Sequence, residues 1–105
     1  MPIKVLIKRR FKEGHLKEIQ NLLKEARYDA MGREGYISSE TLWDLENPFR
    51  VVVASYWRNI EDWNNWGNSG LRKSIEQKFD GLLDGETEYE IFEMGSYPHY
   101  LHHRQ

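Results

Sequence analysis

Cysteine is absent from the 105-residue sequence. The chain can therefore form no disulfide, supply no thiol nucleophile and offer no thiolate ligand to zinc or to an iron–sulfur cluster. No apolar run approaches the roughly 20 residues that span a bilayer, and the first residues lack the apolar core of a signal peptide. We therefore expect a cytoplasmic protein that has no membrane partner.

A large excess of charge of one sign is also lacking. The 15 Lys and Arg and 17 Asp and Glu leave a formal net charge of -2, which gives no bulk attraction for nucleic acid. The run Lys8-Arg9-Arg10 is short enough to be a solvated strand end. Charged residues make up 30% and hydrophobic ones 39%, a globular composition. We expect one domain over residues 1–95, followed by a C-terminal tail at 96–105.

Hydrophobic periodicity predicts strands and helices in alternation. Near the N-terminus, Ile3, Val5 and Ile7 share one face of a strand. Further on, apolar residues recur at helical spacing, and a turn around Pro48 joins two β-branched, aromatic runs into a hairpin. The predicted strands are residues 3–11, 36–45, 50–57 and 87–94, and the predicted helices are residues 15–31, 59–67 and 71–83.

The order of these elements predicts the α+β class and a ferredoxin-like β-α-β-β-α-β fold, with a four-stranded antiparallel sheet that carries its helices on one face. The opposite face is then uncovered. With the first and third strands in the centre, Ile3 or Leu6, Val52 and Tyr56 would be available to a second subunit. We therefore expect a homodimer.

Three tryptophans surround the corner where the third strand leads into the next helix. Trp57 ends the strand, Asn59 is suited to cap the helix, and Trp63 and Trp66 follow within it. Indole rings can form a wall for a flat substrate. The alternative is that these rings only fill the core, as buried aromatic residues usually do.

These features resemble the antibiotic-biosynthesis monooxygenase family over about residues 1–94. The resemblance rests on Gly35-Tyr36 before the second strand, the turn at Pro48, Tyr56-Trp57, Asp62-Trp63, and Trp66 with Ser69 after it. It implies ferredoxin-like protomers that pair sheet against sheet into a dimeric α+β barrel. Family members include cofactor-free oxygenases of polycyclic aromatics, haem-degrading oxygenases and quinol-related enzymes.

Site residues of the family transfer only in part. Trp66 matches the tryptophan that borders the pocket in both the aromatic oxygenases and the haem degraders. The histidine and the first-strand asparagine of the haem degraders fall at Glu76 and Ile7, and an asparagine of the polyketide oxygenases falls at Asp62. An ionised aspartate accepts hydrogen bonds but cannot donate one.

The resemblance implies a cofactor-independent monooxygenase that oxidises a small, electron-rich aromatic or quinol-type substrate with dioxygen and binds neither a cofactor nor a metal. Trp66 would form the aromatic slot, Tyr56 or Arg72 would donate to the substrate anion, and Asp62 would be the base, with Glu76 as another candidate. Two alternatives stay open: a haem-binding or haem-degrading protein, and a non-catalytic dimer that binds a small molecule.

Three of the four histidines lie near the C-terminus, at His99, His102 and His103. Imidazoles at this spacing could ligate a transition metal. No acid or cysteine nearby completes a site, and chain ends are usually mobile. We therefore predict no metal site there.

Overall fold

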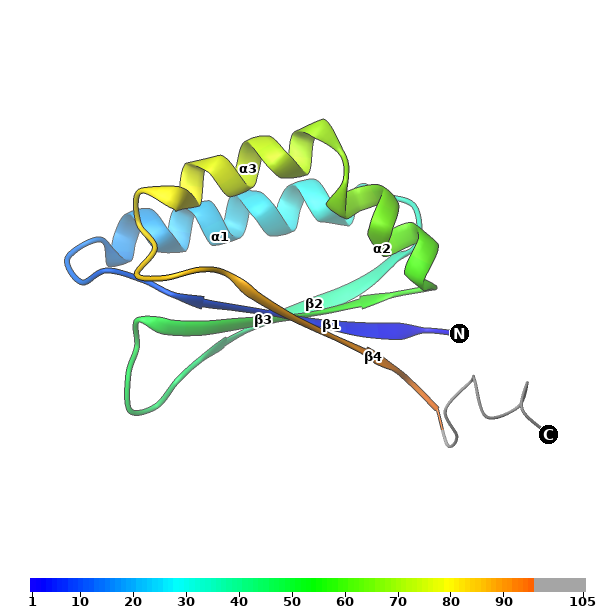
Figure 1. The fold of residues 1–105 in the computed structure, drawn as a ribbon, viewed down its shortest axis with the longest axis horizontal. Coiled ribbons are helices and arrows are strands. Elements are labelled where there is room, and N and C mark those ends of the chain that lie inside the picture. The colour runs from blue at the N-terminus through cyan, green and yellow to red at the C-terminus, as the bar shows by residue number, and fades with distance from the viewer. Residues whose placement is uncertain (96–105) are drawn as a thin grey trace.

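The computed structural model describes residues 1–95 and places three helices on one face of a four-stranded antiparallel sheet (Figure 1). This confirms the predicted ferredoxin-like α+β fold, including the division of the second helical region into two helices. The predicted tail at 96–105 lies outside the described residues. In chain order the elements are β1 (Ile3–Arg10), α1 (Leu16–Met31), β2 (Tyr36–Trp43), β3 (Arg50–Trp57), α2 (Ile60–Gly67), α3 (Gly70–Asp80) and β4 (Glu88–Glu93).

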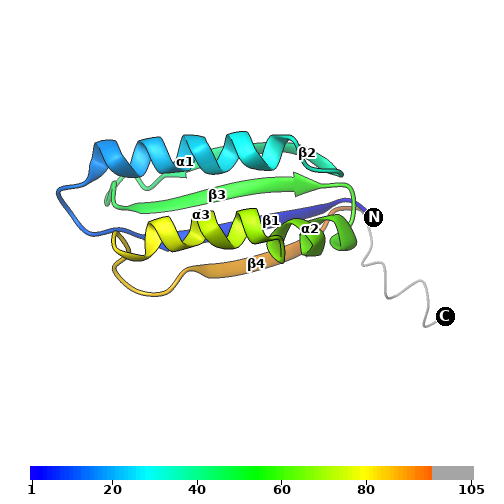
Figure 2. The same cartoon turned by 90° about the horizontal axis from the view of Figure 1, so that it is seen from above.

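The strand order is β2-β3-β1-β4, so the first and third strands are central, as expected. The register between these two strands runs from Ile3 opposite Trp57 to Arg10 opposite Arg50. Seen from above, α1 runs along the β2 side of the sheet and α3 along the β4 side (Figure 2). The space between the helices and the central strands therefore holds the core.

Period-two alternation on β1 determines which side chains enter that core. Val5 is fully buried, and Ile3, at 4% exposure, also faces the helices. Ile3 is therefore unavailable to a second subunit, contrary to one of the alternatives above. The outer face carries Leu6, and the register places Val52 and Tyr56 on that same face.

Side-chain caps fix where the two short helices begin. The Asn59 side chain accepts a hydrogen bond from the Asp62 amide at 2.9 Å, as the sequence predicted. After the break, Ser69 Oγ accepts from the Arg72 amide at 3.2 Å and starts α3. This second cap places Arg72 in the first turn of α3, where its side chain is buried.

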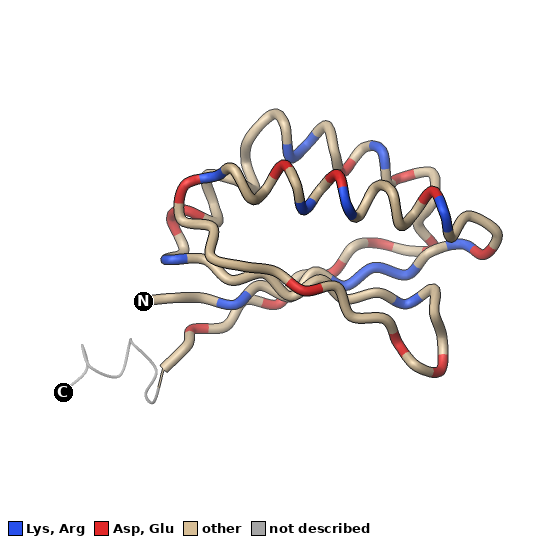
Figure 3. The backbone as a smooth tube through the Cα atoms, turned by 180° about the vertical axis from the view of Figure 1, so that it is seen from behind, with Lys and Arg blue, Asp and Glu red and all other residues tan. Residues whose placement is uncertain are grey.

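The outer face of the sheet mixes charge with apolar surface. Lys8 pairs with Glu90 there, and Lys4 lies over the Tyr56 ring at 5.3 Å. Both signs of charge are spread over the helices and strands (Figure 3). Within residues 1–95, no helix combines the length and the apolar character that crossing a membrane requires.

Candidate functional site

A small cavity lies between the sheet and the helices. Its floor comes from β1 and β3, its roof from α2 and α3, and its remaining wall from α1 and the edge strand β2. The cavity volume is about 50 Å³, room for one or two waters at about 30 Å³ each. The side chains around it form an aromatic wall at one end and a charged cluster at the other.

The aromatic wall consists of Trp57, Trp63 and Trp66, all 7% exposed or less. The rings of Trp57 and Trp63 meet edge to face, with centroids 5.8 Å apart. The Trp57 indole N–H donates to Ser55 Oγ at 3.1 Å, so burial leaves this polar group satisfied. The wall is thus held by packing and can present rigid apolar surface to a flat ring.

The charged cluster joins β1 to α3 through one carboxylate. Glu76 Oε1 accepts from Arg9 Nη2 at 2.5 Å and from Arg72 Nε at 3.2 Å. Arg72 Nη2 also donates to the Tyr89 hydroxyl at 2.9 Å. The arginine side chains are 3% and 7% exposed, and that of Glu76 is 23% exposed.

Two guanidinium groups and one carboxylate leave this cluster with a net positive charge in a poorly solvated place. Burial lowers the pKa of Arg9 below its usual range, and the Glu76 charge opposes that shift. Ring faces cover the cations as well, since Arg9 lies 4.3 Å from the Phe79 centroid and Arg72 lies 5.3 Å from that of Trp63. The cavity is therefore suited to an anion beside an aromatic ring.

Of the predicted site residues, Trp66 and Arg72 both line the cavity. Tyr56 lies on the opposite face of the sheet, where its hydroxyl donates to Glu40 at 3.2 Å. Asp62 is buried but outside the cavity lining, and its Oδ2 accepts from Arg58 Nε at 2.9 Å. The structure thus brings two of the four predicted residues together at the cavity.

Arg9 is a buried, charged cavity residue that the sequence interpretation missed. The expectation of a solvated strand end is wrong for this side chain, which is 4% exposed as a residue. The signal was present, because alternation from Ile3 through Ile7 places Arg9 on the same inward face. Glu76 and Ile7, the positions where the haem degraders carry other residues, also line the cavity.

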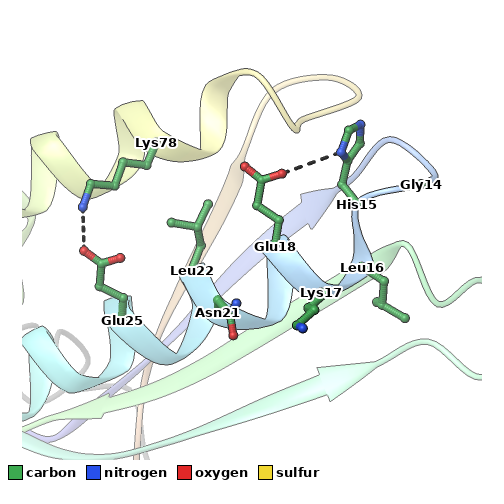
Figure 4. A pocket seen from close by; sticks show the side chains of 9 residues that line it. All are labelled: Gly14, His15, Leu16, Lys17, Glu18, Asn21, Leu22, Glu25 and Lys78. Atoms are coloured by element: carbon green, nitrogen blue, oxygen red, sulfur yellow. Dashed lines mark hydrogen bonds and ion pairs between the residues drawn. The ribbon is translucent and has the colours of Figure 1, made fainter.

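A second hollow lies on the surface where α1 begins (Figure 4). It is larger, at about 720 Å³, but its lining is mostly exposed. Most of its charged groups pair with one another, Glu25 with Lys78 at 2.6 Å and His15 with Glu18 at 3.7 Å (Figure 4). We favour the smaller cavity because three of its polar residues, Arg9, Ser55 and Arg72, are buried, and because Arg9 and Arg72 converge on Glu76.

The donor set of the cavity does not suit haem iron, for which histidine, cysteine, methionine or tyrosine is the usual axial ligand. Among the described residues that line it, none is His, Cys or Met, and the one tyrosine, Tyr36, shares a hydrogen bond with Ser39. Over residues 1–95, no group of three or more His, Cys, Asp and Glu is placed to hold a metal ion. The tail histidines lie outside the described residues.

Known proteins that resemble this chain share its fold. The profile of the antibiotic biosynthesis monooxygenase family matches residues 2–78. A conserved protein from Methanosarcina mazei Go1 is 27% identical, with a TM-score of 0.81 over 88% of this chain and 91% of that one. SnoaB, a cofactor-independent oxygenase from Streptomyces nogalater, is 9% identical, with a TM-score of 0.81 over 91% and 95%.

A putative antibiotic biosynthesis monooxygenase from Nitrosomonas europaea is 11% identical and has a TM-score of 0.82, with 92% of each chain covered. At these identities the two monooxygenase structures establish likeness of fold. No curated protein matches the sequence.

Proposed function

Because the chain belongs to the antibiotic biosynthesis monooxygenase family, we propose that it is a cofactor-independent monooxygenase of small, electron-rich aromatic compounds such as anthrones. The observation that carries this proposal is the cluster of Glu76 with the buried Arg9 and Arg72 beside the tryptophan wall. An oxygenase without a cofactor must bind a ring, remove a proton from it and stabilise the resulting anion. The cavity holds a group for each of these three tasks.

Each task has a side chain suited to it. Trp66 would hold the ring by stacking, and Glu76, the one carboxylate among the described lining residues, would accept the acidic proton. Arg72 would donate to the substrate oxygen as it becomes an enolate. Tyr56 and Asp62, which lie away from the cavity, have no part in this scheme.

The reaction balances without an external reductant. The enolate gives one electron to dioxygen, and the radical pair then forms a carbon–oxygen bond as a hydroperoxide. Loss of water leaves a carbonyl on the same carbon. One oxygen atom stays in the product and the other leaves as water, so the substrate supplies all the electrons.

The cavity must widen to admit such a substrate. Ligand pockets usually measure about 300–1,000 Å³, against about 50 Å³ here. The wall between α1 and the edge strand β2 includes the small side chains of Ala26, Ala30 and Ser39 and the exposed Arg27, beside the larger Leu23 and Tyr36. We propose that the substrate enters there, where separation of the two elements breaks no strand pairing.

Oxygen consumption tests the proposed function. Wild-type protein should consume dioxygen with an anthrone faster than the spontaneous reaction, and Trp66→Ala should lower kcat/KM by roughly 10–100-fold because the stacking surface is lost. Trp66 is 3% exposed, so the milder Trp66→Phe guards against loss of the fold. Trp43→Ala, at 37% exposure and outside the cavity, is the matched control.

If a panel of anthrones and hydroquinones is oxidised no faster with the protein than without it, the oxygenase assignment fails. The protein would in that case be a non-catalytic module that binds a small molecule. If the protein is active but folded Trp66→Ala has an unchanged kcat/KM, Trp66 is not part of the site.

We further propose a homodimer that buries the outer sheet face, in the cytoplasm. Leu6 lies at the middle of that face, opposite Ala54 on β3 and Glu90 on β4. Leu6→Lys should raise the dimer dissociation constant by at least about 100-fold, since it places a charge in the buried interface. Sedimentation velocity measures this, with Leu45→Lys at a fully exposed turn position as control. A wild-type protein that is monomeric at micromolar concentration would contradict the proposal.

A further inference from the structure

The Arg9 side chain has hydrogen-bonding capacity that the fold leaves unused. Its Nη2 atom donates to Glu76 at 2.5 Å. Its Nε atom is buried, and within residues 1–95 no group accepts a hydrogen bond from it. Buried donors are nearly always satisfied, and those on charged groups are the most costly to leave unpaired. This N–H belongs to a side chain that lines the cavity.

Charge in the cluster points to the same need. Glu76 is shared between Arg9 and Arg72, so one carboxylate balances two cations. Arg72 uses Nη2 again to donate to the Tyr89 hydroxyl at 2.9 Å, while Arg9 has no second polar partner among the described residues. The excess positive charge is shared by the two arginines, and the hydrogen-bond donor left without an acceptor is on Arg9.

Arg9 and the tryptophan wall lie toward opposite ends of the central strands. Arg9 pairs with Val51 at one end of β3, and Trp57 is at the other end. Both side chains nevertheless line the same cavity. A ligand that contacts both ends would carry its aromatic body at one end and a compact anionic group at the other.

We propose that the cavity binds an aromatic carboxylate, with the ring on the tryptophan wall and the carboxylate accepting a hydrogen bond from Arg9 Nε. A guanidinium suits this ligand because its planar fork matches carboxylate geometry. The inference rests on the proposed function for the oxidation of the ring and for the widening of the cavity between α1 and β2. It makes Arg9 the residue that selects substrates by charge, whereas Arg72 acts at the reacting oxygen.

Calorimetric binding of two matched ligand pairs tests the inference: 2-naphthoate against 2-naphthamide, and anthraquinone-2-carboxylate against its carboxamide. None of these compounds is an oxygenase substrate, so binding is measured whether or not the protein has that activity. We expect at least one carboxylate to bind roughly tenfold more tightly than its amide, the preference of a charge-assisted hydrogen bond over a neutral one.

Arg9→Met removes the charge while keeping much of the side-chain length, and it should abolish the preference for carboxylate. If Arg9→Met does not fold, Arg9→Lys keeps the charge but loses the fork, and the preference should fall at least about threefold. Arg10→Gln, at an exposed position next to Arg9 and outside the cavity lining, is the matched control, and it should keep the preference. Loss of the preference in Arg10→Gln alone would assign it to the surface charge and overturn the inference.

Equal affinity of acid and amide, or no saturable binding of either carboxylate, would overturn the inference and indicate that water alone satisfies Arg9 Nε. The two proposals fail separately. A carboxylate preference without catalysed oxygen uptake by any anthrone removes the oxygenase and keeps the binding site. Catalysed oxygen uptake with neutral anthrones but no carboxylate preference removes the carboxylate site and keeps the oxygenase.

Discussion

Replacing Gly35 with alanine is expected to lower the free energy of unfolding by about 2–4 kcal/mol. Gly35 has φ +84, a left-handed conformation that disfavours a side chain. A Cβ atom there would also lie 2.5 Å from the Asp62 Cβ, and closer still to the carboxyl group of Asp62. Rotation of the Asp62 side chain cannot relieve this clash, because Cβ itself is involved. Thermal unfolding should show a melting temperature lower by roughly 10–25 °C.

Alanine substitutions at two other glycines distinguish the cost of the left-handed backbone conformation from the cost of the steric clash. Gly14 has φ +92, but a Cβ atom added there would meet no other atom within 4 Å, so Gly14→Ala isolates the backbone cost. Gly32 has φ -83, and the nearest neighbour of an added Cβ, the Asp29 carbonyl oxygen, is 4.0 Å away. Gly32→Ala should therefore change stability little. If Gly35→Ala is no more destabilised than Gly14→Ala, the close approach to Asp62 has no energetic role.

This contact matters because it fixes the start of β2 against the start of α2. The Gly35 carbonyl accepts from the Arg58 amide at 2.8 Å, and Arg58 in turn binds Asp62. The same corner carries Trp57 and Trp63. Asp62 is thus placed to hold the tryptophan wall in position, which accounts for a buried carboxylate that lies outside the cavity.

The fold could be predicted from the sequence because each element has a strong local signal. Period-two alternation marks β1, and Asn59 and Ser69 cap the two short helices with their own side chains. The sheet order then follows from the hairpin and the crossover connections. Where the predicted and observed ends of an element differ, they differ by one to three residues. For example, β2 ends at Trp43 rather than at residue 45.

The site was predicted less well, since it depends on side chains from distant elements. Trp66 and Arg72 do line the cavity. The face of Tyr56 could have been obtained from its spacing, because it is one residue before the inward Trp57. The ion pair between Arg9 and Glu76 could not have been predicted. Glu76 lies 67 residues away in the sequence and meets Arg9 only when α3 packs on the sheet.

Replacing Glu76 with glutamine should lower kcat for anthrone oxidation by about 100- to 10,000-fold if Glu76 is the base. The amide keeps the shape of the side chain but cannot take up the substrate proton. Stability should fall by about 1–3 kcal/mol, because two buried guanidinium groups lose their shared anion while the 23% exposure of the Glu76 side chain limits the loss. Glu25→Gln is the matched control: Glu25 pairs with Lys78 at the surface, and such pairs contribute under about 1 kcal/mol.

The pH dependence of the rate separates a base from a merely structural carboxylate. As pH rises, a growing fraction of the anthrone enters the cavity already ionised and needs no base, so the activity of Glu76→Gln should recover toward that of the wild type. KM should not rise, since removing a negative charge leaves Arg9 and Arg72 freer to bind an anion. A loss of kcat that is constant across pH, or a rise in KM of the same size as the fall in kcat, would instead mean that Glu76 only holds the two arginines in place.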